Sequence, residues 1–135
     1  MISVQGELEK ALSRVANAPI EVVCAGRTDA GVHATGQIVH FEAPVERRLR
    51  SWILGANSNL PADISVLSAF EPDPDFHARF SATARSYRYV ILNRATRSAL
   101  HGRRVTWWFK PLDVARMQEA AKALLGTHDF SSFRA

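Results

Sequence analysis

The run of residues 71–75, with the sequence EPDPD, constrains the fold of this chain more than any other stretch. Each proline fixes φ, lacks a backbone N–H and disfavours helix in the residue before it, so neither a helix nor a central strand continues through the run. The charge balance also changes here. Residues 1–75 carry 6 basic and 10 acidic residues, a balance of −4, whereas residues 76–135 carry 11 and 3, a balance of +8. We therefore expect two domains, residues 1–74 and residues 75–135.

Apolar residues in the first domain follow helical spacing in some segments and extended spacing in others. Val4, Leu8 and Leu12 fall on one helical face, and Ser3 before them is a typical N-cap. Runs rich in β-branched residues indicate strands between the helical segments. The elements expected in this domain are a helix between Ser3 and Asn17, strands over 20–25, 38–42 and 64–70, and a helix over 47–56 followed by a turn over 57–61.

The second domain shows two extended patterns followed by one helical pattern. We expect strands over 86–93 and 105–109 and a helix over 114–125, which Gly126 would end. Helices and strands thus mix along the whole chain. This order predicts an α+β fold, with a sheet layered with helices on one face.

Composition excludes several classes of protein. A single cysteine, Cys24, cannot form an internal disulfide, which favours a reducing compartment. The longest apolar runs, such as residues 89–92, are too short to span a membrane, and the first residues do not resemble a signal peptide. The five histidines lack the spacing of a metal site, and no nucleotide-binding motif or nucleophile elbow is present. We expect a soluble, cytoplasmic chain without metal, cofactor or membrane partner.

The second domain contains a basic window, residues 77–111, which has no acidic residue. Arginine outnumbers lysine 14 to 3 in the whole chain, and the planar guanidinium group suits phosphates and stacks on bases. Aromatic residues lie between the arginines, a mixture that favours RNA or a single strand over simple phosphate attraction. The alternatives are a solvated basic face and, for Tyr89 and Trp107 taken singly, the core face of a strand. The basic side chains of the window are Arg79, Arg85, Arg88, Arg94, Arg97, Arg103, Arg104 and Lys110, with His77 and His101 among them.

The loop over residues 26–34 is the strongest candidate for chemistry. It places a lone carboxylate, Asp29, between two glycines, with Arg27 two residues earlier. Loops on a rigid scaffold commonly hold reactive groups, and glycines permit close approach of a ligand. Arg27 could anchor a phosphate and favour the ionised form of Asp29. The alternative is a tight turn in which Asp29 only accepts backbone hydrogen bonds. Cys24, just before the loop, is expected to be a small core residue.

The loop sequence GRTDAGVHA resembles the signature of the tRNA pseudouridine synthase A family. Further segments resemble that family in the same order, so the likeness extends over essentially the whole chain. It implies a pseudouridine synthase-like α+β fold with a mixed, mainly antiparallel sheet and helices on one face. The further segments are residues 4–12, 57–64, 76–89 and 125–133.

The resemblance implies an isomerase that converts uridine to pseudouridine at positions 38–40 of the tRNA anticodon stem-loop, without cofactor or metal. Asp29 matches the essential aspartate of the family. Arg27 matches the arginine that holds the target nucleotide, and Tyr87 the tyrosine that stacks on the target base. We expect Arg79, Arg85 and Arg88 to contact the RNA backbone. Family members are homodimers whose tRNA lies across both subunits.

The chain also departs from the family pattern. Family members have a strand before the first helix and continue well beyond the segment 125–133, so we expect an incomplete sheet, truncated at both ends. Two hypotheses follow. In the first, Asp29 makes the protein a pseudouridine synthase. In the second, the chain is a catalytically inactive fragment that acts at most as a tRNA- or RNA-binding module.

Overall fold

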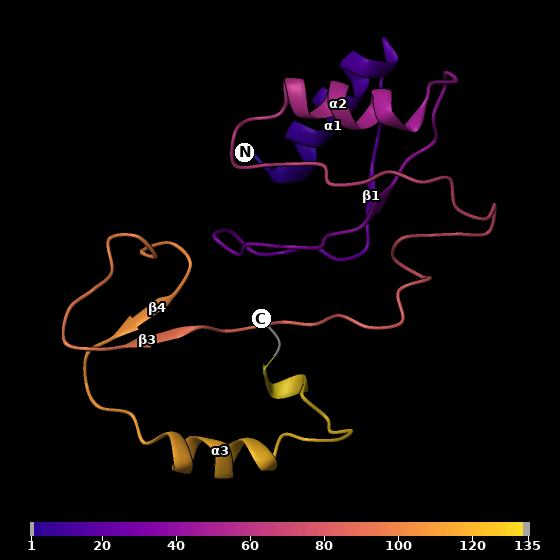
Figure 1. Cartoon of the computed structure of the whole chain (residues 1–135). Coiled ribbons are helices and arrows are strands. Elements are labelled where there is room, and N and C mark those ends of the chain that lie inside the picture. The colour runs from indigo at the N-terminus through magenta and orange to yellow at the C-terminus, as the bar shows by residue number, and fades with distance from the viewer. Residues whose placement is uncertain (1, 134–135) are drawn as a thin grey trace. The chain divides into compact units, whose positions relative to one another are not determined.

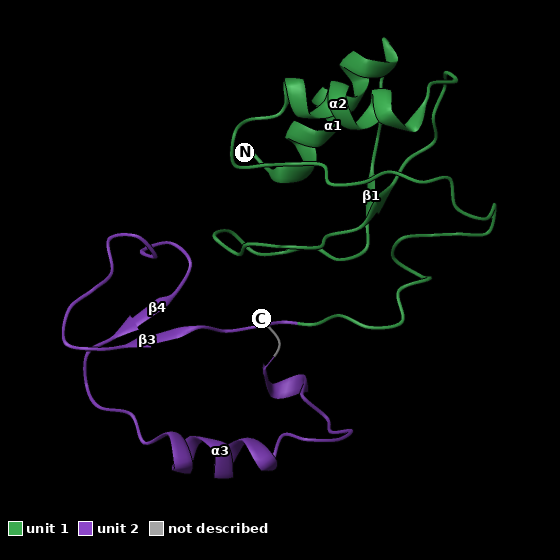
Figure 2. Ribbon diagram, viewed as in Figure 1, with its two compact units in different colours: residues 1–86 green, residues 87–135 purple. Residues whose placement is uncertain are grey.

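The computed structural model describes residues 2–133, and the chain divides into two compact units, residues 1–86 and residues 87–135 (Figure 1, Figure 2). Residues 1, 134 and 135, at the outer ends of the two expected domains, lie outside the described residues. The boundary between the units follows Ser86, downstream of the proline-rich run. The assignment of a catalytic-loop role and an RNA-binding role to two domains stays a prediction.

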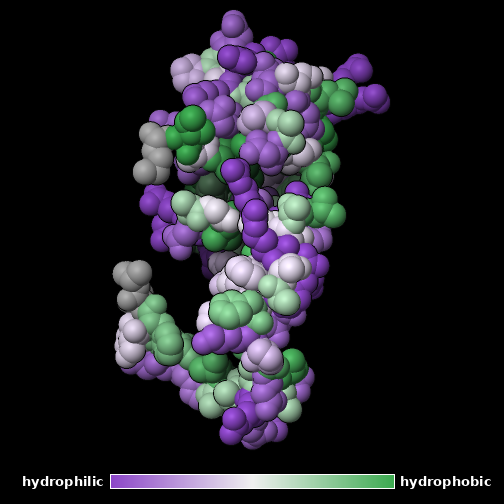
Figure 3. All heavy atoms as spheres, turned by 90° about the vertical axis from the view of Figure 1, so that its left-hand side faces the viewer, coloured by the Kyte–Doolittle hydropathy of each residue, from purple (hydrophilic) through white to green (hydrophobic). Residues whose placement is uncertain are grey.

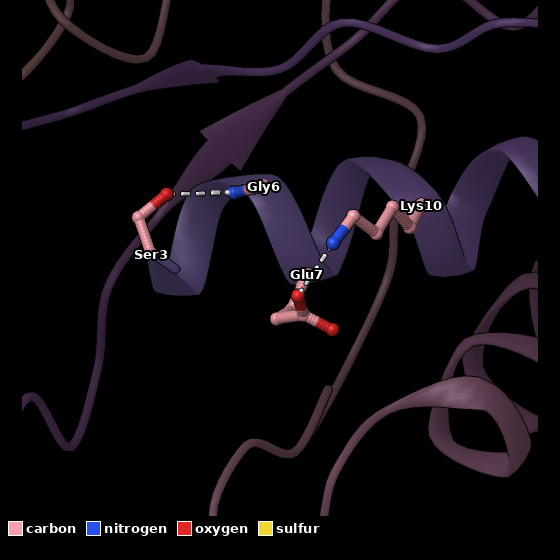
Figure 4. A network of polar contacts seen from close by, with 4 residues as sticks. All are labelled: Ser3, Gly6, Glu7 and Lys10. Atoms are coloured by element: carbon pink, nitrogen blue, oxygen red, sulfur yellow. Dashed lines mark hydrogen bonds and ion pairs between the residues drawn. The ribbon is translucent and has the colours of Figure 1, made fainter. Parts of the chain in front are cut away.

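Helix α1 (Val4–Ala16) begins and ends with the caps that its sequence predicts. Ser3 Oγ accepts a hydrogen bond from the Gly6 N–H at 3.1 Å (Figure 4). At the other end, Asn17 adopts the left-handed conformation with φ 55°. An N-cap of this kind stabilises a helix by about 1 kcal/mol. The prediction of this helix is confirmed, because the groups that delimit it are local in sequence.

Helix α2 (Leu49–Asn59) packs against α1, and the two helices provide most of the core of the first unit (Figure 1). The helices approach closely at Gly55, where an added Cβ would lie 2.6 Å from Val15 Cγ2. The buried core residues are Leu12, Ala16, Ile20, Val22, Trp52 and Ala56.

Helix α2 continues through part of the segment that was expected to form a turn. Ser58 Oγ donates a hydrogen bond to the Leu54 carbonyl and Asn59 Nδ2 donates one to the Gly55 carbonyl, each at 2.8 Å. Both side chains therefore bond back to the carbonyl four residues earlier. The predicted end at residue 56 is wrong, because these polar residues support the last turn of the helix.

The first unit contains a small antiparallel sheet of β1 (Val23–Cys24) and β2 (Val39–His40). Its strands are shorter than the predicted strands over 20–25 and 38–42. Side chains of α1 hold the residues before β1: Glu9 Oε1 accepts a hydrogen bond from the Val22 N–H at 3.2 Å, and Gln5 Nε2 donates one to the Val22 carbonyl at 3.1 Å. These bonds satisfy both backbone polar groups of Val22.

The predicted strand over 64–70 is wrong: the segment is not assigned to any ladder among the described residues. Asn57 on α2 supplies both backbone hydrogen bonds of Val66 instead. Its Nδ2 donates to the Val66 carbonyl at 2.8 Å and its Oδ1 accepts from the Val66 N–H at 2.7 Å. A side-chain amide thus takes the place of a neighbouring strand at Val66, and alternation in sequence does not by itself specify a strand partner.

In the second unit, β3 (Ile91–Asn93) and β4 (Thr106–Trp108) form a parallel pair with Leu92 opposite Trp107. Both strands are shorter than the predicted strands over 86–93 and 105–109. Asn93 ends the ladder, because its Nδ2 donates hydrogen bonds to the carbonyls of Trp108 and Lys110 at 2.8 and 2.6 Å.

Helix α3 (Val114–Lys122) starts at an N-cap, Asp113, whose Oδ1 accepts a hydrogen bond from the Arg116 N–H at 3.0 Å. It ends before the predicted residue 125, because the chain then tightens into bonds between residues three apart and reaches Gly126 with φ 97°. A short 3₁₀ helix, η1 (Ser131–Phe133), follows.

The α+β class is confirmed: the described residues form three α-helices and two small sheets, consistent with part of a pseudouridine synthase fold. Where one sheet layered with helices was expected, the described residues have one antiparallel and one parallel pair of strands. Hydrophobic side chains lie among hydrophilic ones on the surface (Figure 3). Within residues 2–133, no helix combines the length and apolar character that a membrane crossing requires.

Candidate functional site

The loop that carries Asp29 leaves the sheet directly after β1. Its first residues, Ala25 and Gly26, are here called the loop root. The Ala25 N–H donates a hydrogen bond to the Ile38 carbonyl at 2.9 Å, and Gln37 Nε2 donates one to the Gly26 carbonyl at 2.6 Å. The two ends of the loop are therefore bonded to each other, so the loop projects from the sheet as one closed unit.

Asp29 starts a tight turn, as one of the two interpretations of the sequence predicts. The Val32 N–H donates a hydrogen bond to the Asp29 carbonyl at 3.1 Å, and Gly31 has φ 84°. A positive φ at the third residue of a turn is typical of type II and favours glycine. The backbone carbonyl of Asp29 closes the turn, and the carboxylate is not used in that bond. Asp29 is exposed, so its carboxylate is accessible to a substrate.

Arg85 reaches the loop root from a segment 60 residues later in the sequence. Its Nη2 donates hydrogen bonds to the Ala25 carbonyl at 2.6 Å and to the Arg79 carbonyl at 3.4 Å. Its side chain also lies against Gly26, where an added Cβ would be 3.2 Å from Nε. The structure therefore brings the side chain of Arg85 and the backbone of Arg79 to the base of the Asp29 loop.

Two histidines to which the sequence assigned no such role hold the segment of Arg79. His40 Nδ1, on β2, accepts a hydrogen bond from the N–H of the buried Ala78 at 3.1 Å. His77 Nδ1 accepts from the N–H groups of Arg79 and Phe80 at 3.2 and 3.3 Å. Both rings therefore accept backbone hydrogen bonds through Nδ1. No periodicity or spacing in the sequence could have indicated the contact of His40, because His40 and Ala78 lie far apart in the chain, whereas His77 bonds to residues only two and three positions later.

The environment of Cys24 agrees with its expected place in the core. The side chain is half-buried and packs against the core of the first unit. Burial raises the pKa of the thiol, the negative charge of Glu9 raises it further, and the positive charge of Arg27 lowers it in part. Arg27 is exposed. Its positive charge nevertheless lowers the pKa of Cys24, the residue before the loop root.

Tyr87 and Arg88 belong to the second unit, whereas Arg27, Asp29, Arg79 and Arg85 belong to the first. The Tyr87 side chain is 77% exposed, and its assignment to the target base stays a prediction.

The expectation that Tyr89 and Trp107 face a core is not met within the described residues, because they are 77% and 41% exposed. Each still has a polar partner. Tyr89 Oη accepts a hydrogen bond from Thr106 at 2.6 Å, and Trp107 Nε1 donates one to the Arg94 carbonyl at 3.0 Å.

A metal centre is not evident in the part of the chain that the structure describes, since no three His, Cys, Asp or Glu side chains there lie close enough to hold an ion. The candidate site is thus a carboxylate on a turn, with arginines at the base of its loop. Such an arrangement suits acid–base or nucleophilic chemistry on a polyanionic substrate.

Comparison with known proteins identifies the family of this chain. The model of the tRNA pseudouridine synthase family matches residues 2–81, more than half of the chain. The chain therefore belongs to the tRNA pseudouridine synthase family.

Relatives named tRNA pseudouridine synthase A are similar over nearly the whole chain. Those of Methylococcus capsulatus and Pseudomonas aeruginosa are 60% identical over 133 residues, which is 98% of this chain and 49% and 47% of the relatives. That of Klebsiella pneumoniae is 61% identical over 133 residues, 98% of this chain and 49% of the relative. The chain thus spans about half the length of the curated relatives that it matches.

Proposed function

We propose that this chain carries the catalytic loop of a tRNA pseudouridine synthase that isomerises uridine in the anticodon stem-loop, at positions 38–40. The observation that carries the proposal is the Asp29 turn. Its backbone closes the turn while its exposed carboxylate stays available, in a chain that belongs to this family. The names of the relatives support tRNA as the substrate.

The reaction needs no external oxidant or reductant. The bond between uracil N1 and ribose C1′ breaks, the base turns, and a bond between C5 and C1′ forms. The hydrogen on C5 leaves as a proton, and N1 gains one. An ionised Asp29 can attack the ribose, attack the uracil, or abstract a proton that opens a glycal route. In each route the carboxylate must be close to an extruded nucleotide.

Extrusion of the target nucleotide costs a few kcal/mol, which contacts to the protein must offset. In our proposal Arg27 holds that nucleotide and Tyr87 stacks on its base. Arg79 and Arg88 contact the RNA backbone, supported by the balance of +8 over residues 76–135. A second copy of the protein completes the tRNA interface, and the enzyme acts in the cytoplasm.

The test is release of tritium from tRNA labelled at uridine C5, with this chain and its Asp29→Asn variant. We expect the substitution to lower the rate at least about 100-fold, because it removes the reacting carboxylate, and to leave tRNA affinity nearly unchanged. Asp63→Asn is the matched control, since Asp63 is also an exposed aspartate of the first unit. Equal release by the Asp29→Asn variant and the unmodified chain would contradict the catalytic assignment.

A second candidate function is tRNA binding without catalysis. The excess of positive charge in residues 76–135 favours it independently of Asp29. Salt-dependent tRNA binding without any tritium release from the unmodified chain would support this second function over the first.

A further inference from the structure

The carbonyl of Ala25 lies at the boundary between the sheet and the Asp29 loop. The N–H of the same residue donates to the carbonyl of Ile38, just before β2, but its carbonyl accepts its hydrogen bond from Arg85 at 2.6 Å. Three residues separate Ala25 from Asp29. The guanidinium group therefore holds the chain just before it turns toward the candidate catalytic carboxylate.

Arginine is suited to this position because its planar group has five donors in a fixed arrangement. One nitrogen, Nη2, is near the carbonyls of both Ala25 and Arg79, which belong to separate segments of the first unit. Hydrogen bonds from a charged donor are stronger than those between neutral groups. Arg85 therefore links the loop root to the 76–85 segment, which His40 anchors on β2.

Gly26 provides the space for this contact. Its φ is not positive, so the backbone itself does not demand glycine. An added Cβ would instead lie 3.2 Å from Arg85 Nε and 3.6 Å from Cδ. Gly36, near the other end of the loop, has nothing within 4 Å of such an atom. The two glycines thus form a matched pair, of which only one is restricted by Arg85.

We propose that Arg85 is a positioning residue that fixes the Asp29 loop through the Ala25 carbonyl, rather than a general contact to tRNA phosphate. This role rests on the proposed function of Asp29, because Arg85 determines the position of Asp29. Displacements of about 1 Å at a reacting group can cost about 100-fold in rate. Loss of the Arg85 contact should therefore slow the chemical step and leave the electrostatic part of tRNA binding intact.

Three measurements on this chain test the role. They are amide hydrogen exchange over residues 25–32, the salt dependence of tRNA binding, and the single-turnover rate of tritium release. We expect Arg85→Ala to speed exchange of the loop about tenfold, to slow release at least about tenfold, and to leave the salt slope unchanged. Arg85→Lys should restore the rate in part, because an ammonium group keeps one charged nitrogen that can donate to both carbonyls.

Arg79→Ala is the charge-matched control, since it removes one positive charge nearby but keeps the Arg79 carbonyl. We expect it to reduce the salt slope by about one contact without faster loop exchange. Gly26→Ala should speed loop exchange less than Arg85→Ala does, because the Arg85 side chain must shift by only a few tenths of an ångström, whereas Gly36→Ala should resemble the unmodified chain. Circular dichroism identifies any variant that fails to fold, and Gly26→Ala tests the contact independently of charge.

The proposal is overturned if Arg85→Ala lowers the salt slope as Arg79→Ala does while loop exchange stays unchanged. Exchange and binding do not depend on turnover, so they decide the role of Arg85 even if Asp29→Asn retains activity. Retained activity of the Asp29→Asn variant would refute the proposed function of Asp29 and leave only the structural contact of Arg85.

Discussion

Cys24 precedes the loop root in sequence and Arg27 follows it. The pKa of the Cys24 thiol responds to the positive charge of Arg27. Burial raises the pKa of Cys24, Glu9 raises it further and Arg27 opposes both. The folded chain therefore favours the protonated thiol. This preference contributes stability that is present below the unfolded-state pKa of the thiol and is lost as the pH rises through the higher folded-state pKa.

The interaction between Arg27 and Cys24 predicts how Arg27→Gln changes the reactivity of Cys24, which takes no part in the proposed reaction. Removal of the positive charge should raise the pKa of Cys24 further, so the thiol should react with iodoacetamide more slowly at a given pH between about 8 and 9, because only the thiolate is nucleophilic. Alkylation rates followed by mass spectrometry measure the change. Arg14→Gln, on the exposed side of α1, is the control. An unchanged or faster rate in the Arg27→Gln variant would show that the charge of Arg27 does not lower the pKa of the Cys24 thiol.

The crossing of α1 and α2 shows how one small side chain sets the distance between two elements. Gly55 lies against Val15, and an alanine Cβ there would be 2.6 Å from Cγ2. Valine is stiff at χ1 in a helix, so its methyl group cannot turn away freely. Overpacking of this kind costs about 1–3 kcal/mol, whereas alanine in place of glycine favours a helix by about 1 kcal/mol.

At this crossing, Gly55→Ala should destabilise the chain by about 1 kcal/mol, the difference between the two effects. In a Val15→Ala background the same substitution should instead stabilise the chain, because only the helix propensity remains. Urea denaturation of the four chains of this double-mutant cycle measures the coupling free energy. Destabilisation of equal size in both backgrounds would mean that Val15 is not the residue that restricts Gly55.

Buried side chains are distributed unevenly over the whole molecule. Among the described residues, every buried hydrophobic side chain lies in the first unit, and Ser98 is the buried residue of the second. Apolar burial is the main favourable contribution to folding, so local stability should differ between the units.

We therefore expect the slowest amide exchange of the chain in α1 and α2 and faster exchange in β3, β4 and α3, under conditions where the chain is folded. Hydrogen exchange followed by mass spectrometry on the intact chain measures this order. Addition of tRNA should slow exchange in the second unit if its arginines contact RNA. Protection of β3 and β4 equal to that of α1 in the absence of tRNA would contradict the expectation.

Several features of this protein are determined by residues close together in sequence. Ser3 and Asn17 delimit α1, and Gly31 shapes the Asp29 turn. Each depends on hydrogen bonds or dihedral angles within a few residues, so sequence alone identifies it. The nine residues of the loop, together with four further segments in the same order, also indicated the family, and the family match confirmed it.

Other features depend on contacts between distant residues, and only the tertiary structure decided them. Asn57 takes the place of a strand beside Val66, His40 anchors Ala78, and Arg85 bonds to Ala25 across 60 residues. The alternation over 64–70 and the basic window were both visible in the sequence, but neither specifies a partner. Hydrophobic periodicity records which face is buried, whereas a hydrogen bond between distant segments depends on where the folded chain places the donor and the acceptor.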